Sequence, residues 1–120
     1  MWCRGIRGAT SVAANTRDDI LAATKELLQE IVDSNQIEKE AVACAFFTTT
    51  ADLDAEFPAL AARQLGWREV PLLCCQEINV PDSLPKCIRI LILFNTQKRI
   101  DEIKHIYLRG TEVLRREPEG

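Results

Sequence analysis

A single cation interrupts the most apolar segment of this chain, and it restricts what that segment can become. Arg89 lies within residues 87–94, where the other residues are apolar and predict a buried β-strand. Removing a guanidinium from water is costly, and arginine cannot lose its proton to escape that cost. The segment therefore predicts that Arg89 meets an anion, which is either a carboxylate of the protein or a ligand.

The composition is typical of one ordinary soluble domain. The chain has 120 residues, of which 47% are hydrophobic and 28% are charged. A net charge of -3 argues against a general nucleic-acid-binding protein, since such proteins usually carry a basic excess. A small anion stays compatible with this charge, because a local group of arginines can bind it whatever the sign of the whole surface.

The cysteines and the N-terminal sequence predict the cellular compartment of the protein. Five cysteines, including the adjacent pair Cys74 and Cys75, do not form a disulfide framework, and no spaced Cys/His set predicts a zinc site. The sequence starts directly in a strand pattern without a signal peptide, and no apolar run approaches membrane-spanning length. We expect a cytoplasmic, soluble protein with reduced thiols and no membrane contact.

The periodicity of apolar residues predicts both helices and strands. One long amphipathic helix is expected to begin after an N-cap at Thr16 and to end near Asn35. A short helix follows Pro58 and ends at Gly66, and another is expected over residues 99–104. Strands are predicted over residues 2–9, 41–50, 71–80, 86–95 and 105–115, the last of them interrupted by Gly110.

This order of elements predicts an α+β fold with one mixed sheet of about five strands packed on the long helix and the short helices. One main helix covers only one face of such a sheet, so the other face is left to solvent or to a partner subunit, and the apolar strands favour the partner. We assign residues 1–115 to a single domain and residues 116–120 to a flexible C-terminal tail.

Three charged residues are unusual in their sequence context. Arg7 lies between two glycines, Glu77 follows an apolar strand, and Arg89 interrupts one. A structural explanation exists for each, and Glu77 with Arg89 fits a plain ion pair across neighbouring strands. Considered together with Arg63 and Arg115, which lie near element ends, these residues fit an anion-binding site equally well.

The other residues that could be catalytic or bind a ligand also have structural explanations. Cys74 in an apolar strand is more typical of a small core residue than of a nucleophile, so a thiol enzyme using Cys74 or Cys75 is the weakest hypothesis. His105 alone is more typical of a half-exposed strand residue than of a general base or metal ligand. Tyr107 lies on the same face as His105, and its hydroxyl either contacts a ligand or caps a core ring.

Several spaced blocks resemble one known family, in order, over nearly the whole chain. The blocks are residues 4–10, residues 57–59 with Arg63, residues 66–67 before residues 70–71, Cys74 with residues 76–77, residues 86–89, His105 with residues 107–108, and residues 113–115. This series is similar to the AroH class of chorismate mutases, and the resemblance implies a homotrimer shaped as a pseudo-α/β-barrel. It also implies rearrangement of chorismate to prephenate at active sites between subunits, in phenylalanine and tyrosine biosynthesis.

The resemblance assigns site residues to two neighbouring subunits. Arg63 and Arg115 are expected to add positive potential at the rim, and Cys74 is expected to contact the substrate without covalent chemistry. The sequence departs from the family at Leu60, because the Phe-Pro-Ala block usually continues with lysine. One subunit would contribute Arg7, Leu73, Cys74, Glu77, Arg89, Tyr107, Leu114 and Arg115, and the next would contribute Phe57, Ala59, Leu60 and Arg63.

The implied reaction suits these residue types. A Claisen rearrangement needs no nucleophile, metal or cofactor, but negative charge builds on the ether oxygen as its bond lengthens, and a fixed cation there stabilises the transition state. The resemblance implies that Arg89 is this cation and that Arg7 holds a carboxylate of the dianion. Tyr107 would add a hydroxyl, and Glu77 would accept a hydrogen bond from the ring hydroxyl.

A different class of function is also open at this stage. A trimeric binding or regulatory protein would keep a small-anion site between subunits without catalysing a reaction. The combination of Arg7, Arg89 and Glu77 discriminates, because a generic carboxylate binder needs the arginines but not a glutamate that accepts a specific hydroxyl.

Overall fold

A computed structural model describes residues 1–116 of the chain. The predicted tail begins at Arg116, which is the last residue of a 3₁₀ helix, and residues 117–120 lie outside the described residues. The elements, in order, are β1 (Trp2–Ser11), α1 (Arg17–Asn35), η1 (Lys39–Ala41), β2 (Val42–Thr49), α2 (Ala59–Gln64), β3 (Leu72–Gln76), β4 (Cys87–Thr96), η2 (Ile100–Glu102), β5 (Ile106–Tyr107) and η3 (Glu112–Arg116), where η denotes a 3₁₀ helix.

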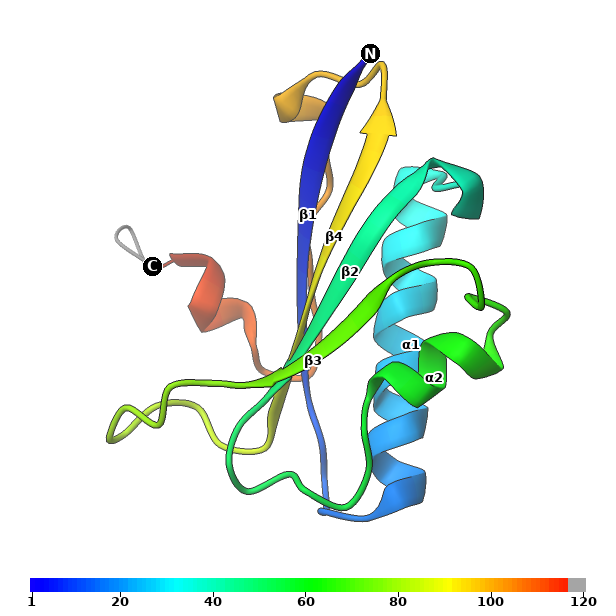
Figure 1. Cartoon of the computed structure of the whole chain (residues 1–120). Helices are drawn as coiled ribbons and strands as arrows, with labels where there is room; N and C mark the ends of the chain where they lie inside the picture. The colour runs from blue at the N-terminus through cyan, green and yellow to red at the C-terminus, as the bar shows by residue number, and fades with distance from the viewer. Residues whose placement is uncertain (117–120) are drawn as a thin grey trace.

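The strands form one mixed sheet in the order β3-β2-β4-β1-β5 (Figure 1). β4 pairs antiparallel with β1 and β2, whereas β2 with β3 and β1 with β5 are parallel pairs. The predicted α+β class and the predicted number of strands are therefore confirmed. The strand that carries Arg89 lies at the centre of the sheet.

The long helix begins and ends where the sequence predicts. The Thr16 hydroxyl accepts a hydrogen bond from the Asp19 backbone N–H at 3.1 Å, which satisfies one of the free donors of the first turn. Asn35 is the last helical residue, and Gln36 follows in the left-handed conformation with φ 54°. Ile20, Leu27 and Ile31 and their neighbours on the same helix face are buried against the sheet.

A glycine lets α1 approach the sheet closely. A Cβ atom on Gly8 would lie 2.5 Å from Ile31 Cδ1 and 3.1 Å from Leu27 Cδ1, which is too close for a real side chain. The glycine in β1 therefore sets the distance between helix and sheet. Gly5, on the other face, has no such neighbour, because the nearest atom to its Cβ position is Leu93 Cδ2 at 3.5 Å.

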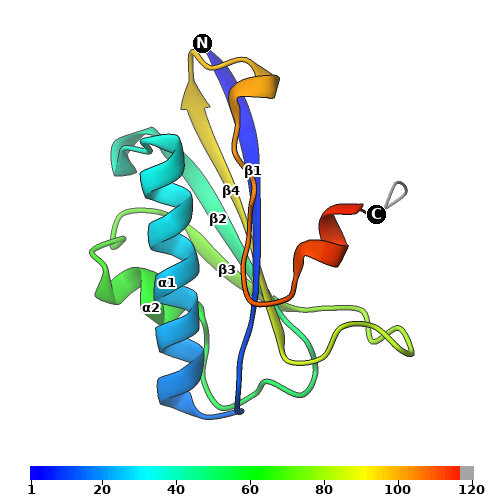
Figure 2. The same ribbon diagram turned by 180° about the vertical axis from the view of Figure 1, so that it is seen from behind.

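Both α-helices cover the same face of the sheet (Figures 1 and 2). We call the opposite side of the sheet the open face. In β4 the alternating residues Ile88, Ile90 and Ile92 are fully buried under the helices, whereas Arg89 and Leu91 point to the open face and are exposed. The expected uncovered face is thus confirmed for the single chain.

The structure corrects two of the predicted strands. The strand predicted over residues 71–80 ends at Gln76, since β2, its neighbour, ends at Thr49; Ile78 beyond it is 85% exposed. The strand predicted over residues 105–115 is wrong except for Ile106–Tyr107. Arg109 and Gly110 adopt positive φ values of 50° and 81°, which turn the chain out of the extended direction and into η3.

The predicted helix over residues 99–104 is only the 3₁₀ turn η2. Glu102 accepts a hydrogen bond from the Arg99 backbone N–H at 2.8 Å, and the chain is extended again at Ile103. The short helix predicted after Pro58 is confirmed as α2, and Gly66 follows it with φ 94°.

Candidate active site

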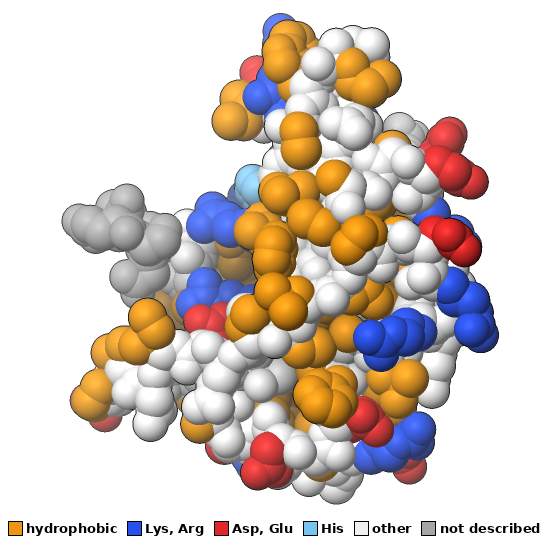
Figure 3. Space-filling view, in the orientation of Figure 1, with side chains coloured by type: hydrophobic (Ala, Val, Ile, Leu, Met, Phe, Trp, Pro, Cys, Tyr) orange, Lys and Arg blue, Asp and Glu red, His pale blue; other side chains and the backbone are white. Residues whose placement is uncertain are grey.

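A pocket of about 250 Å³ lies on the open face of the sheet, and we call it the arginine pocket. Strand alternation and register place its polar residues together: Arg7 of β1 lies opposite Leu91, and Ala9 lies between Arg89 of β4 and Tyr107 of β5. Figure 3 shows basic side chains beside the only histidine, bordered by hydrophobic side chains. The lining residues are Arg7, Gly8, Phe46, Thr48, Glu77, Arg89, Ile90, Leu91 and Tyr107.

Arg89 forms an ion pair with Glu77 at one side of this pocket. Its Nε lies 3.0 Å from Glu77 Oε2. The arginine side chain is 47% exposed and the glutamate side chain 23% exposed, so the prediction of a buried Arg89 is wrong for the single chain. The physical reason is that β4 is buried on one face only.

The pairing leaves most of the guanidinium free. Among residues 1–116, no hydrogen bond is formed by either terminal nitrogen of Arg89, and Arg89 lines the pocket. A guanidinium carries five N–H donors in a planar fork, so an oxygen of a ligand can be bound while Nε stays paired.

Glu77 is held by the adjacent strand β2. Its backbone N–H donates a hydrogen bond to the Thr49 carbonyl at 2.8 Å, and the Thr48 hydroxyl donates to its Oε2. Thr48 and Phe46 also line the pocket, although their residue types alone do not predict it. Their alternate positions in the predicted strand 41–50 are the signal that places both on one face.

Tyr107 of β5 lines the pocket, and His105 lies next to Arg7, which also lines it. The Arg7 backbone N–H donates a hydrogen bond to His105 Nδ1 at 3.0 Å, so this nitrogen carries no proton. Burial lowers the pKa of His105, and the positive charges of Arg7 and Arg115 lower that pKa further. Arg115 therefore lies near His105.

Leu114 reaches the same region from η3. A small cavity of about 50 Å³ lies between Leu114, Glu77 and Arg89. Four of the eight residues that the resemblance assigns to one subunit line the arginine pocket in this chain, namely Arg7, Glu77, Arg89 and Tyr107. Leu114 lines the small cavity beside Glu77 and Arg89, and Arg115 lies near His105.

Cys74 belongs to a different pocket, of about 370 Å³, which it lines together with Phe57. We call it the Phe57 pocket. Cys74 and Leu73 point to opposite faces of β3, and Leu73 is exposed on the open face. The chain therefore does not bring Cys74 and Arg89 into one pocket. The Phe57 pocket is lined by Thr49, Leu53, Asp54, Ala55, Glu56, Phe57, Pro58, Cys74, Cys75 and Gln76.

The environment of Cys74 is that of a protonated thiol. Burial raises its pKa, and a hydrogen bond from the Ala59 backbone and the charge of Arg63 only partly oppose this. Ala59 is buried, Leu60 is half-buried and Arg63 is exposed on α2. These three residues thus lie on the Phe57 side of the chain, apart from the arginine pocket.

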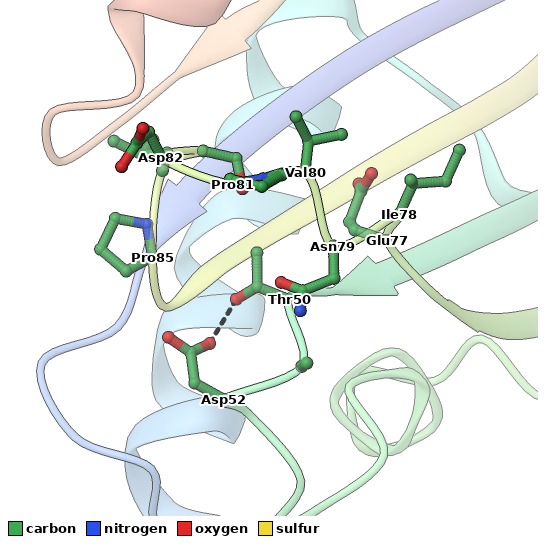
Figure 4. Close-up of a pocket in the computed structure, with 12 residues that line it drawn as sticks. Thr50, Asp52, Glu77, Ile78, Asn79, Val80, Pro81, Asp82 and Pro85 are labelled. Atoms are coloured by element: carbon green, nitrogen blue, oxygen red, sulfur yellow. Dashed lines mark hydrogen bonds between the residues drawn. The ribbon is translucent and has the colours of Figure 1, made fainter.

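A third pocket, of about 250 Å³, lies between the loop after β3 and the end of β2 (Figure 4). We call it the loop pocket. The Thr50 hydroxyl donates to Asp52 at 2.5 Å and the Lys86 backbone N–H donates to the same carboxylate at 2.9 Å. The bond from Thr50 is the main reason that the pKa of Asp52 is lowered. Glu77 borders this pocket as well as the arginine pocket.

Residues 1–116 lack two further features. No helix among them has the length and apolar character that crossing a bilayer requires. No group of three or more His, Cys, Asp or Glu side chains among them is arranged to hold a metal ion. All five cysteines are free thiols.

Comparison with known proteins identifies the family. A model of chorismate mutase type I matches residues 3–118. The chain is 45% identical to chorismate mutase AroH of Bacillus subtilis (strain 168) over 116 residues, which cover 96% of this chain and 91% of the relative. It is 48% identical to chorismate mutase AroH of Thermus thermophilus over 113 residues, or 93% of each chain.

A solved structure supports the same conclusion. A chorismate mutase from Clostridium thermocellum superposes with a TM-score of 0.90 at 49% sequence identity, covering 94% of this chain and 99% of that chain. The chain belongs to the chorismate mutase type I family, in agreement with the resemblance stated from its sequence blocks.

Proposed function

We propose that this chain is a chorismate mutase, an isomerase that rearranges chorismate to prephenate on the way to phenylalanine and tyrosine. The observation that carries the proposal is the arginine pocket, in which Arg7, Arg89 and Glu77 meet on the open face. A family match over nearly the whole chain supports it. The reaction uses no cofactor and no metal, and the protein acts by placing charge and restricting shape.

Arg89 is the proposed catalytic cation. As the ether bond of the substrate lengthens, negative charge builds on its oxygen, and a fixed guanidinium stabilises the transition state more than the ground state. The free terminal nitrogens of Arg89 beside the pocket support this role. Glu77 is proposed to accept a hydrogen bond from the ring hydroxyl through the oxygen that Arg89 does not use.

The remaining polar groups hold the substrate in its compact reactive shape. Chorismate carries two carboxylates, and arginine forks fix carboxylates through paired, charge-assisted hydrogen bonds. Arg7 is the proposed first clamp, Tyr107 adds a hydroxyl, and Arg115 and Arg63 add positive potential at the rim. A rate gain of about a millionfold needs about 8 kcal/mol, whereas one such bond contributes roughly 1.5–3 kcal/mol, so several donors must act together.

We propose that the complete site forms between subunits of a homotrimer shaped as a pseudo-α/β-barrel. The arginine pocket is open on the uncovered sheet face, and the Phe57 pocket lies elsewhere on the same chain, so contact between subunits can join the two. In this arrangement Leu73 and Leu114 line the arginine side. Phe57, Ala59, Leu60 and Arg63 come from the neighbour.

The geometry changes the proposed position of one residue. The sequence-based assignment groups Cys74 with Arg89, but Cys74 shares a pocket with Phe57. We therefore place Cys74 on the Phe57 side of the intersubunit site. A contact role without covalent chemistry fits a thiol whose pKa is raised by burial. The five free cysteines fit a reducing compartment, and we propose a cytoplasmic location.

Purified protein mixed with chorismate tests this function. The ultraviolet absorbance of chorismate should decay far above the uncatalysed rate, and prephenate should appear in equal amount. Substrate that persists at the uncatalysed rate while still binding would favour the non-catalytic anion-binding protein. Loss of turnover on alkylation of Cys74 or Cys75 without blocking the pocket would favour a thiol enzyme.

A further inference from the structure

Thr48 lies beside the Glu77 carboxylate. It lies in β2, directly opposite Arg89 of β4 and Cys75 of β3, and its side chain lines the arginine pocket. Its hydroxyl donates a hydrogen bond to Oε2 of Glu77. This is the same oxygen that pairs with Arg89 Nε at 3.0 Å.

Glu77 borders the arginine pocket, the loop pocket and the small cavity beside Leu114. It is the first residue after β3, and Figure 4 shows it in the loop pocket beside Ile78 and Asn79. The backbone hydrogen bond to the Thr49 carbonyl fixes where the residue lies but not how its side chain rotates. An interaction of the carboxylate itself must therefore select the arginine pocket.

Within residues 1–116, the carboxylate has two partners, Thr48 and Arg89. Arg89 has a long side chain that is half exposed, and ordering such a side chain costs conformational entropy. Thr48 is short, β-branched and half-buried in a paired strand, so its rotamer is restricted before any ligand binds. The threonine is thus the more rigid of the two partners.

We propose that Thr48 is a positioning residue for the rearrangement. By donating to Oε2 it holds the carboxylate in the arginine pocket, leaves Oε1 to accept from the substrate hydroxyl, and aligns the guanidinium of Arg89 through the shared oxygen. Its effect on turnover rests on the proposed function, whereas its effect on the position of Glu77 does not.

The direct test replaces the hydroxyl while keeping the shape. Thr48→Val should lower kcat about tenfold and change KM less than about threefold, as expected for one lost hydrogen bond to a charged group that acts in the transition state. Thr48→Ala should show the same loss, and Thr48→Ser, which keeps the hydroxyl, should stay within about threefold of the wild type. Thr96→Val, which removes a hydroxyl at the far end of β4, is the matched control.

A double-mutant cycle separates positioning from a general effect on the strand. In a Glu77→Ala background the hydroxyl has no carboxylate to hold, so Thr48→Val should cost no further turnover. An unchanged tenfold loss in that background would overturn the inference, and so would full kcat in Thr48→Val or equal losses in the valine and serine variants.

Crystal structures of the wild type, Thr48→Val and Thr48→Ser provide a readout besides activity. The carboxylate should turn away from Arg89 in the valine variant and stay beside it in the serine variant. An unchanged carboxylate in Thr48→Val would contradict the inference even in an active enzyme. A wild-type chain without turnover would contradict the proposed function instead, and the crystallographic comparison would still decide the role of Thr48.

Discussion

Arg89 Nε lies 3.0 Å from Glu77 Oε2, and this ion pair stands at the edge of the arginine pocket. The sequence allowed either a structural ion pair or a ligand-binding cation at this position. The geometry supports both at once, because the pairing orients the guanidinium while its terminal nitrogens stay beside the arginine pocket. An internal acid paired with Arg89 therefore does not exclude catalysis by Arg89.

Gly8→Ala should destabilise the fold by about 1–3 kcal/mol, because the new Cβ overlaps Ile31 Cδ1. Urea unfolding measures this free energy. Gly5→Ala is the matched control with a small effect, since its Cβ meets nothing closer than 3.5 Å. Adding Ile31→Val, which deletes the overlapping methyl group, should recover part of the loss. Equal losses for the two glycine variants would contradict the close-approach explanation.

Asn35→Ala should cost about 2–4 kcal/mol of unfolding free energy. The fully buried side chain donates to the Lys104 carbonyl at 2.9 Å and accepts from the Lys104 backbone N–H at 2.8 Å. Truncation leaves both backbone groups without their partner, and each unsatisfied group costs about 1–3 kcal/mol. Gln29→Ala, on the exposed face of the same helix, should change stability by less than about 0.5 kcal/mol.

The imidazole of His105 should titrate below its ordinary pKa of 6.5 in the folded protein, since burial and the charges of Arg7 and Arg115 lower that pKa. The unfolded chain then binds the proton more readily, so this contribution to stability is complete above about pH 6.5 and is lost as the pH falls through the folded-state pKa. Urea unfolding between pH 5 and 7 measures the loss. His105→Asn, which keeps an acceptor without titrating, should remove this pH dependence.

The same histidine reports on ligand binding. A bound dianion offsets the charges of Arg7 and Arg115, so saturating prephenate should raise the pKa of His105. As the only histidine in the chain, it gives a single set of imidazole signals in NMR spectra. An unchanged pKa in the complex would contradict carboxylate binding at Arg7 and Arg115.

Leu60→Lys should restore the cation that the family usually has at this position. We expect KM for chorismate to fall about threefold at low salt with kcat nearly constant, because a rim charge acts on association and affinity more than on the chemical step. The gain should shrink as salt screens the charge. Gln64→Lys, an exposed position on the same short helix, is the control for added charge. A change in kcat alone would contradict a rim role for this position.

Much of the fold follows from local signals in the sequence. The Thr16 cap, the apolar stripe to Asn35 and the strands around Arg89 are set by neighbours in the chain, and all three appear as predicted. The strand predicted over residues 105–115 fails because Arg109, which is not a glycine, takes a positive φ that residue type alone does not indicate. The end of β3 depends on where β2 stops, which is a contact between distant segments.

The site likewise contains residues that the sequence predicts and residues that it does not predict. Arg7, Glu77 and Arg89 stand out by their residue types, and the sheet register brings them together as the strand alternation indicates. Thr48 does not stand out, because a threonine in a strand is ordinary until its partner is known. The separation of Cys74 from Arg89 does not follow from residue type either. It depends on the side chain of Cys74 pointing to the face of the sheet opposite to that of Arg89.

The turnover of Arg89→Ala on chorismate tests the central claim most directly. Arg109→Ala is the matched control, because Arg109 also pairs with a glutamate, Glu26, at 2.9 Å but lies outside the arginine pocket. With both variants folded, as judged by thermal unfolding, kcat should fall at least about a hundredfold for Arg89→Ala and stay near the wild-type value for Arg109→Ala. Turnover of Arg89→Ala within about threefold of the wild type would contradict the assignment of Arg89 as the cation that stabilises the transition state.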